Sequence, residues 1–351
     1  MSLAQVALDA VAPPVPAEVT DRFRECAKDV DQGLGDLRDG LRWLGERGLL
    51  GGELATRVAL IEAIAGECMS SAFSLWAQGM VIDYLVRGGV DETRVDSLRR
   101  GETVGVTAMA PALRDVAGIE PVPVIGTRLP DGGVRLDGPI RWASNLFPDA
   151  VVVSPVRFSD DGAGDEGRAI VRFRLSADGV NVRTSPKLLA LDGTASSSVA
   201  LDGVHVPAGD VLTTDLTGFV KAVRPAFLLT QTAFCAGLAA RAATGAEQHC
   251  TGLNAELRPD IDDMCARVVS VRNRLHAWAS APDEPGPADL LRLRLEASAA
   301  AGDATRLEAT TRGGAGYVAT SDVSRRLREA AFLPIQSPTE GQLRWELSRY
   351  A

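Results

Sequence analysis

Residues 134–145 read Val-Arg-Leu-Asp-Gly-Pro-Ile-Arg-Trp-Ala-Ser-Asn and belong to a part of the chain whose texture differs from both flanks. Short β-branched segments separated by Asp-Gly turns are typical of antiparallel strands. Val171, Phe173 and Leu175 alternate with arginines, which predicts a strand with one buried face. The predicted strands are residues 103–109, 134–140, 150–158, 169–175 and 197–206. Together they predict a compact β domain.

Helical patterns flank this β block on both sides. Before it, apolar residues recur at helical spacing until Gly101 ends the pattern. After it, helices are predicted at residues 219–243, 262–279, 289–311 and 324–332, with a last one starting at Ser337. We therefore expect an α+β fold with four parts. These are an N-terminal arm (1–17), an N-terminal helical domain (18–102), a middle antiparallel β domain (103–215) and a C-terminal helical bundle (216–351).

The predicted last helix has a well-formed start. Ser337 is a favourable N-cap, Pro338 suits the first helical position, and Glu340 stands three residues after the cap. This arrangement is a capping box with proline at the first position. It accounts for Glu340 without any catalytic role.

Composition and charge exclude several classes of function. The chain has 351 residues, 46% of them hydrophobic, which is enough for two or three globular domains. A net charge of −9 argues against wholesale nucleic-acid binding. The five cysteines lack CxxC spacing, so neither a disulfide framework nor a metal site is expected. The first residues lack a basic signal-peptide region, and the longest apolar run (225–240) is too short to span a bilayer. We expect a cytoplasmic protein without a membrane partner.

Four stretches, together with the order of the predicted domains, resemble the acyl-CoA dehydrogenase family. Residues 136–145 resemble the family's Leu-Asn-Gly…Trp-Ile-Thr/Ser-Asn motif, the most specific of the four. Residues 101–111 resemble the first strand and flavin-contacting turn, and residues 199–207 the exit strand. Residues 313–330 resemble Gly-Gly-x-Gly-Tyr…Arg-x-x-Arg-Asp-Ala. The resemblance covers nearly the whole chain and implies the family's fold, with a C-terminal four-helix bundle around FAD.

The resemblance also implies a chemistry and a set of partners. In the family, FAD takes a hydride from Cβ of an acyl thioester while a carboxylate removes the α-proton. The α-proton is weakly acidic, so a positioned base is needed, while the flavin carries the redox chemistry. The implied substrate is an acyl-CoA or an acyl group on a carrier protein. The implied assembly is a homodimer or homotetramer, or a hetero-oligomer with a full-length relative.

Individual residues match the family's site positions. The residues implied to contact FAD are Met109, Trp142, Ser144, Gly313, Gly314 and Thr339. Trp142 would pack on the flavin, Ser144 would lie near its N5 atom, and Arg224 would stand at the thioester end of the site. Each residue also has a structural interpretation. Trp142 suits a core aromatic, and Gly313 suits a helix C-cap.

The family's catalytic carboxylate is missing from both of its usual positions. Aligning Thr339 places Ser337 at the base position, and the alternative position on the long helix is Val223. A serine hydroxyl is too weak a base unless another base activates it. The nearest carboxylate, Glu340, is therefore the candidate for a displaced catalytic base.

Two FAD motifs are also altered, which leaves the function open. The turn Thr-Glu-Pro-x-x-Gly-Ser-Asp is eroded at residues 109–115, and the Arg-x-x-Phe-Gly segment is absent, with Arg258 in its region. We expect an atypical FAD-dependent oxidoreductase acting on an acyl thioester or a related small molecule. The alternatives are a flavin-dependent monooxygenase-type relative, which uses reduced flavin and oxygen, and a non-catalytic or half-site subunit of a hetero-oligomer.

Overall fold

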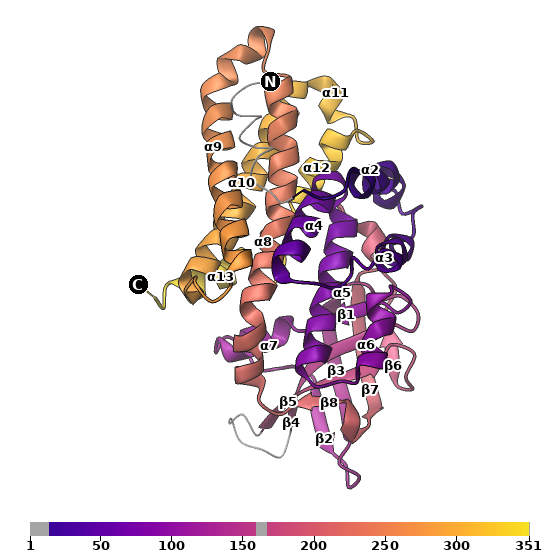
Figure 1. Ribbon diagram of the computed structural model, residues 1–351. Helices are drawn as coiled ribbons and strands as arrows, with labels where there is room; N and C mark the ends of the chain where they lie inside the picture. Colours follow the sequence, from indigo (N-terminus) through magenta and orange to yellow (C-terminus); the bar gives the residue numbers. More distant parts are fainter. Residues whose placement is uncertain (1–13, 159–166, 351) are drawn as a thin grey trace.

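The computed structural model describes residues 14–158 and 167–350. Its elements run from helices through a β-sheet and back to helices, and Figure 1 shows the sheet at one end of the long C-terminal helices. This organisation confirms the predicted α+β fold class. The predicted arm, residues 1–17, lies largely outside the described residues.

The N-terminal helices are α2 (Ala17–Asp31), α3 (Leu37–Glu46), α4 (Leu54–Glu67), α5 (Met69–Arg87) and α6 (Glu92–Arg99). The Asp36 side chain caps α3 by accepting a hydrogen bond from the backbone N–H of Arg38. α4 and α5 are apolar around most of their circumference, as is typical of helices buried on several sides. Accordingly, α4 packs on α8 (Leu216–Gln248), and α5 packs on both α8 and β1 (Gly105–Thr107).

The middle of the chain forms one eight-stranded sheet. Its strands are β1, β2 (Ile125–Arg128), β3 (Val134–Ala143), β4 (Val151–Phe158), β5 (Arg168–Arg174), β6 (Val180–Val182), β7 (Ser197–Val206) and β8 (Val211–Thr213). The order is β6-β7-β3-β2-β4-β5-β8, with β1 beside β4. The expectation of a purely antiparallel domain is corrected, because β1 and β2 pair with β4 in parallel. Other elements separate the strands of each parallel pair along the chain, as parallel pairing requires.

The pairing of β3 with β7 positions the most specific sequence motif. Ile140 lies opposite Val199 and Ala143 opposite Ser197, with a register shift between these two pairs. Trp142 therefore stands in an irregular part of the ladder, and such irregularities often redirect a side chain. The five predicted strands all have counterparts, whereas the short strands β2, β6 and β8 were not predicted.

The remaining helices are α7 (Ala110–Val116), between β1 and β2, and five that follow α8: α9 (Arg258–Ser280), α10 (Pro287–Arg312), α11 (Gly314–Tyr317), α12 (Asp322–Ala330) and α13 (Glu340–Leu347). Figure 1 shows the long helices α8, α9 and α10 side by side. The short helices α12 and α13 both contact α10 and add to these three long helices. Within the described residues, α8 is long and apolar enough to cross a membrane, yet 83% of its most apolar window is buried inside the protein.

The last helix begins later than predicted. Thr339 is the N-cap of α13, and its hydroxyl accepts a hydrogen bond from the backbone N–H of Gln342 at 3.2 Å. Ser337, the predicted cap, instead offers its carbonyl oxygen to Nε2 of Gln231 on α8 at 2.9 Å. Both residues satisfy the local capping rule, because Glu340 stands three residues after Ser337 and Gln342 stands three residues after Thr339. The two differ in the long-range hydrogen bond that Gln231 donates to the carbonyl oxygen of Ser337.

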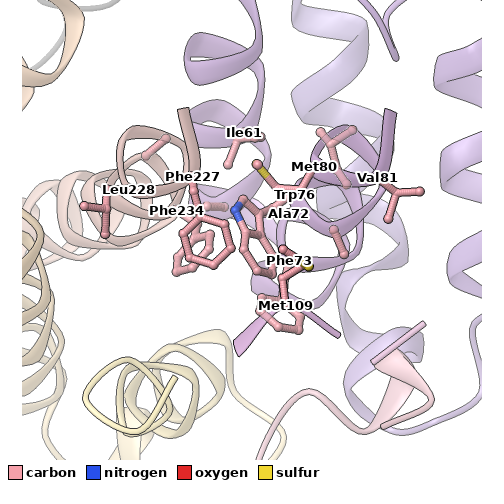
Figure 2. Packing of buried hydrophobic residues seen from close by; sticks show 14 of the residues in the cluster. Ile61, Ala72, Phe73, Trp76, Met80, Val81, Met109, Phe227, Leu228 and Phe234 are labelled. Carbon is pink, nitrogen blue, oxygen red and sulfur yellow. The ribbon is translucent and has the colours of Figure 1, made fainter. Parts of the chain in front are cut away.

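An aromatic cluster fills the core between α5 and α8 (Figure 2). Phe73 stacks on Trp76 with ring centroids 5.2 Å apart, and Phe227 meets Trp76 edge-on, also at 5.2 Å. Phe234 lies 6.2 Å from Trp76, and Phe332 lies 5.2 Å from Phe73. Such pairs add to the stability that burial provides, and they fix the walls of the adjoining cavity.

Candidate functional site

A cavity of about 550 Å³ opens where the helical parts meet the sheet. Its lining comes from α5, α7, α8, the end of β3, residues 188–196 and residues 328–339. The lining residues include Phe73, Trp76, Trp142, Ser144, Ser337 and Thr339. Pockets of this size and largely apolar lining hold small molecules or cofactors. Trp142, Ser144 and Thr339 were predicted as site residues from the sequence, and the structure brings all three to this cavity.

On the sheet side, a chain of hydroxyl groups fixes the orientation of Ser144. Its Oγ lies 2.6 Å from Oγ of Ser196, which lies 2.7 Å from Oγ1 of Thr194. Thr194 donates its own proton to the carbonyl oxygen of Leu191 at 2.7 Å. Each hydroxyl has a single proton, so Ser196 donates to Thr194 and Ser144 donates to Ser196. The free lone pairs of Ser144 Oγ therefore suit a donor group in the cavity.

The asparagine that follows Ser144 ties this corner to α5. Oδ1 of Asn145 accepts a hydrogen bond from Oγ of Ser74 at 2.8 Å. Its Nδ2 donates to the carbonyl oxygens of Ser74 and Gly105, both at 3.1 Å. The backbone of Asn145 has φ +63°, a left-handed conformation in which asparagine is enriched. Asn145 thus has a structural role that holds Trp142 and Ser144 in place.

Aromatic side chains line the cavity on more than one side. Trp142 lines it from β3 and remains 49% exposed, which is unusual for so large an apolar group. Phe73, Trp76 and Phe332 line it from α5 and from the segment after α12. A planar ring system would find apolar and aromatic neighbours here.

Three of the predicted FAD contacts lie outside this cavity. Met109 is buried at the N-cap of α7, and its neighbours Ala110 and Pro111 line the cavity in its place. Gly313 ends α10 with φ +58°, and Gly314 begins α11. Neither glycine is among the lining residues. The resemblance to the family predicts that these glycines approach the FAD of a neighbouring subunit.

Arg224 is engaged by a carboxylate and is not among the lining residues. Its Nη2 forms an ion pair with Oε2 of Glu346, and both side chains are largely buried. Gln342 donates to the other oxygen of Glu346 at 3.0 Å. The pair connects α8 to α13. The structure therefore gives Arg224 a structural partner and does not place it against a ligand in the cavity.

The two residues considered for the catalytic base are separated by the structure. Ser337 lines the cavity, and its Oγ is buried without a hydrogen-bond partner among the described residues. Glu340 is not a lining residue; its side chain is 41% exposed and pairs with Arg344 at 2.7 Å. Val223, the alternative base position, lines a separate surface pocket. Glu340 is thus placed away from the cavity that it would have to serve.

One carboxylate does line the cavity, and it is already paired. Among the described lining residues, Glu120 is the only acidic one. Its Oε1 lies 3.1 Å from Nη1 of Arg141 and 3.4 Å from Nε of Arg114. Both arginines line the cavity, as does Arg328, which is held by Asp31 at 2.6 Å. The Glu120 carboxylate is thus already engaged by two guanidinium groups.

The residues present fit FAD in part. Trp142 offers an exposed aromatic face to a flavin ring, and Ser144 offers an acceptor. Arg114 and Arg141 have the chemistry that binds phosphate groups. Ser196, Glu120 and these two arginines were not predicted as site residues, although Arg141 directly precedes Trp142.

No group of three or more His, Cys, Asp or Glu side chains suited to a metal ion occurs among the described residues. Within residues 14–158 and 167–350 the five cysteines are free, and four of them are buried. Burial raises the pKa of the Cys68 thiol to about 12. A thiol with so high a pKa is a poor nucleophile or metal ligand, because both roles require the thiolate.

No family model matches the sequence. Known proteins nevertheless resemble this chain in sequence and in structure. Cyclohex-1-ene-1-carbonyl-CoA dehydrogenase of Geobacter metallireducens is 25% identical over 305 residues, which cover 81% of this chain and 79% of the relative. The structure of glutaryl-coenzyme A dehydrogenase in complex with glutaryl-CoA matches with a TM-score of 0.84 and 18% identity, over 99% of this chain and 95% of that chain.

A third similar structure is the FAD complex of PigA. It matches with a TM-score of 0.80 and 18% identity, over 100% of this chain and 98% of that chain. At these identities the structural matches establish the fold. The chain therefore has the acyl-CoA dehydrogenase fold, with N-terminal helices, a central mixed β-sheet and a C-terminal helical domain.

Proposed function

We propose that the protein is an atypical flavin-dependent oxidoreductase of the acyl-CoA dehydrogenase family, acting on an acyl thioester of CoA or of a carrier protein. The observation that carries this proposal is the cavity between the Trp142–Ser144 corner of the sheet and the segment that ends at Thr339. The similarity to an acyl-CoA dehydrogenase over 81% of the chain supports it. The similarity in fold to the FAD complex of PigA supports the choice of cofactor.

In this proposal the chain's own residues bind FAD and the substrate and hold them in position. FAD, when bound, supplies the acceptor for two electrons. Trp142 would cover a face of the flavin ring, and Ser144 would accept a hydrogen bond from an N–H group of the ring, since its own proton is already donated to Ser196. The aromatic residues Phe73 and Phe332 exclude water, which strengthens electrostatic interactions inside the cavity.

The side chains that line the cavity limit the reactions that the protein can catalyse. Ser337 stands where a carboxylate base is expected, and Glu120 is held by two arginines. The described lining residues therefore offer no carboxylate at position 337, and their one acidic side chain, Glu120, is engaged by guanidinium groups. This favours a second candidate, a monooxygenase-type reaction that uses reduced flavin and oxygen, because such a reaction needs no carboxylate at position 337.

A sequence of three measurements tests these proposals. Pure protein is titrated with FAD and monitored by flavin absorbance and fluorescence; absence of binding overturns both candidates. The FAD complex is then mixed with acyl-CoA thioesters without oxygen, and bleaching of the flavin supports the dehydrogenase. Oxygen consumption with reduced flavin and formation of a hydroxylated product support the monooxygenase instead.

A matched pair of variants tests the location of the cofactor. Trp142→Ala removes the exposed aromatic face that lines the cavity and should weaken FAD binding by about tenfold, the order of one lost aromatic contact. Trp345→Ala is the control, since Trp345 lies on α13 and does not line the cavity. Equal FAD affinity in the two variants would place the cofactor elsewhere.

A further inference from the structure

The helices supply an apolar wall of the cavity. The lining residues on this wall include Phe73, Trp76, Ala77, Phe227 and Phe332. The charged lining residues lie elsewhere, on α7 and the segment that follows it, on β3 and on α12. An apolar ligand group gains most from contact with apolar surface. The hydrocarbon tail of an acyl group would therefore lie against the helix wall.

A second, much smaller space lies behind this wall. It measures about 10 Å³, the room of about one water molecule, and most of its lining side chains are apolar. Trp76 is the only described residue that lines both the cavity and this space. Figure 2 shows Trp76 among residues of both linings: Ile61 and Met80 of the small space, and Phe73 and Phe227 of the cavity. Trp76 is therefore the partition between the two.

Ring packing holds Trp76 in this position. Phe73 stacks on it with ring centroids 5.2 Å apart, and Phe227 and Phe234 meet it edge-on at 5.2 and 6.2 Å. Nε1 of Trp76 is buried and has no hydrogen-bond partner among the described residues. A smaller apolar side chain at position 76 would therefore remove the partition without breaking a hydrogen bond between described residues.

The space behind Trp76 has room to grow once the indole is removed. Gly79 lines it from the next turn of α5 and carries no side chain. A Cβ atom at Gly79 would meet only Nη1 of Arg57, at 3.7 Å. Leu60 and Ile61 of α4 line the same space. Apolar cavities opened in this way stay dry and take up apolar ligands, so the enlarged cavity would admit a longer hydrocarbon tail.

We propose that Trp76 limits the length of the acyl group that the cavity accepts. This inference rests on the proposed function, because it takes the ligand to be an acyl thioester. A tail that lies against the helix wall gains apolar contacts until its end meets the indole. Further methylene groups then find no space, since overpacking a filled core is unfavourable. Trp76 thus makes the site selective for short acyl groups.

A series of straight-chain ligands tests the limit in the wild type. Acetyl-, butyryl-, hexanoyl-, octanoyl- and decanoyl-CoA are titrated into the full chain in the presence of FAD, with binding measured by calorimetry. Burial of one methylene group strengthens binding by about fourfold. We expect the affinity to rise at about this rate for the short members and then to level off or fall. A rise that continues to decanoyl-CoA would overturn the proposal.

Two variants remove the partition. In Trp76→Leu and Trp76→Ala, the first thioester beyond the wild-type limit should bind at least about tenfold more tightly than it binds the wild type, the effect of about two more buried methylene groups. Trp76→Leu keeps more of the apolar packing and remains the test if Trp76→Ala does not fold. Trp43→Ala is the control, because Trp43 lies in α3 and lines neither space. The same length limit in the wild type and in the folded Trp76 variants would contradict the assignment.

A second substitution separates the length limit from a general loosening of the core. Gly79→Leu, introduced into Trp76→Ala or Trp76→Leu, places a side chain in the space that the first substitution opens. The double variant should return to the shorter limit of the wild type. A double variant that still binds the longer thioesters as tightly as the single variant would show that their tails do not enter this space.

Flavin absorbance is recorded in the same samples, so this inference and the proposed function can fail separately. A protein that binds FAD and thioesters, with one length limit in all variants, loses the role of Trp76 and keeps the proposed function. A protein that binds no thioester contradicts the proposed function and the length limit together.

Discussion

Ser337 lines the cavity and carries a neutral hydroxyl group in the position where the family resemblance predicts a carboxylate. The structure offers no substitute nearby, because Glu340 faces solvent and Glu120 is paired with Arg141 and Arg114. A hydroxyl group binds and orients well, but it does not accept a proton near neutral pH. The difference between binding and proton transfer at this residue can be tested directly.

Replacing Ser337 by glutamate should supply the missing base. Ser337 lines the cavity, so the longer side chain has room to enter it. We expect Ser337→Glu to exchange the α-protons of butyryl-CoA with deuterated solvent about a hundredfold faster than the wild type, the lower range for general base catalysis. Mass spectrometry of the recovered thioester measures the exchange. Ser337→Gln is the matched control, and equal exchange in both variants would contradict the idea.

Glu340 provides the opposite test. Its carboxylate pairs with Arg344 on the exposed side of α13 and does not line the cavity. We therefore expect Glu340→Gln to leave FAD affinity and turnover within about twofold of the wild type, whereas loss of a true general base lowers turnover by about a hundredfold or more. Steady-state kinetics with the substrate that proves active would measure this. A hundredfold loss would restore Glu340 as a displaced base.

Several site residues could be predicted from the sequence because a local motif carries them. Trp142 lies near the end of β3 and Ser144 directly follows that strand, whereas their neighbour Asn145 holds this corner through bonds to Ser74 and Gly105, 71 and 40 positions away. Ser337 and Thr339 both look like helix caps, and a bond from Gln231, 106 positions away, determines which one acts. Such a long-range bond leaves no local pattern in the sequence.

At the scale of elements, α8 and α4 approach each other closely at a glycine. A Cβ atom at Gly237 would overlap the backbone carbonyl oxygen of Glu62 and crowd Ala65 at 3.1 Å. Backbone atoms cannot move aside as a flexible side chain can. The contact between these two helices therefore depends on the absence of a side chain at this position.

Gly237→Ala should destabilise the protein despite alanine's higher helix propensity. The expected loss is about 1–3 kcal/mol, as for other overpacked cores. Gly302→Ala is the control, because Gly302 lies in α10 with open space around it and should gain up to about 1 kcal/mol. Urea unfolding monitored by circular dichroism measures both. Equal stability of the two variants would contradict the close approach.

A buried ionic cluster joins α4 to α9. Oε1 of Glu62 accepts from Nε of Arg272 at 2.5 Å, and Oε2 lies 2.6 Å from Nε2 of His276. Burial by itself would raise the pKa of Glu62, but the hydrogen bonds and charges of His276 and Arg272 outweigh it and hold the pKa below its usual range. A carboxylate with a lowered pKa stabilises the folded state above its unfolded pKa, and this stabilisation is lost as the pH falls through the folded pKa.

Glu62→Gln should therefore cost about 3–5 kcal/mol at pH 7, because it removes the buried carboxylate that faces the guanidinium group of Arg272 and the imidazole of His276. The gap between wild type and variant should shrink as the pH falls below the unfolded pKa of about 4.3 and close as it passes through the lower folded pKa. Urea titrations across this pH range measure it. Glu296→Gln, which removes an exposed pair with Arg274, is the control and should cost under about 1 kcal/mol. A gap that does not depend on pH would contradict the ionic account.

Some strands of the sheet could be predicted from the sequence and others could not. The longer strands have β-branched runs and clear turns, whereas β6 and β8 have three residues each and too little pattern to identify them. The parallel pairing of β1 and β2 with β4 was also missed. Parallel pairs depend on contacts between distant segments, so local alternation cannot reveal them.

At the scale of the whole molecule, exposed apolar side chains gather at the end of α10. The connector η4 (Gly252–Leu257) lies against this end, because Nδ2 of Asn254 donates to the carbonyl oxygen of Thr311 at 2.8 Å. Leu253 is 93% exposed and Tyr317 88% exposed, next to Gly313 and Gly314. Exposed apolar groups that lie close together are candidates for a protein–protein contact. The prediction that these glycines approach a neighbouring subunit's FAD would place that contact here.

Tyr317→Glu tests assembly and cofactor binding together. We expect a homodimer or homotetramer for the wild type, and a shift toward the single chain of 37.0 kDa for the variant, measured by light scattering after size-exclusion chromatography. A buried unpaired carboxylate costs several kcal/mol, so the FAD affinity should also fall by at least about tenfold if the neighbouring subunit completes the site. Leu34→Glu is the control, since Leu34 is 75% exposed in the loop between α2 and α3. A monomeric wild type, or a variant with unchanged mass and FAD affinity, would show that this end of the bundle is not an interface.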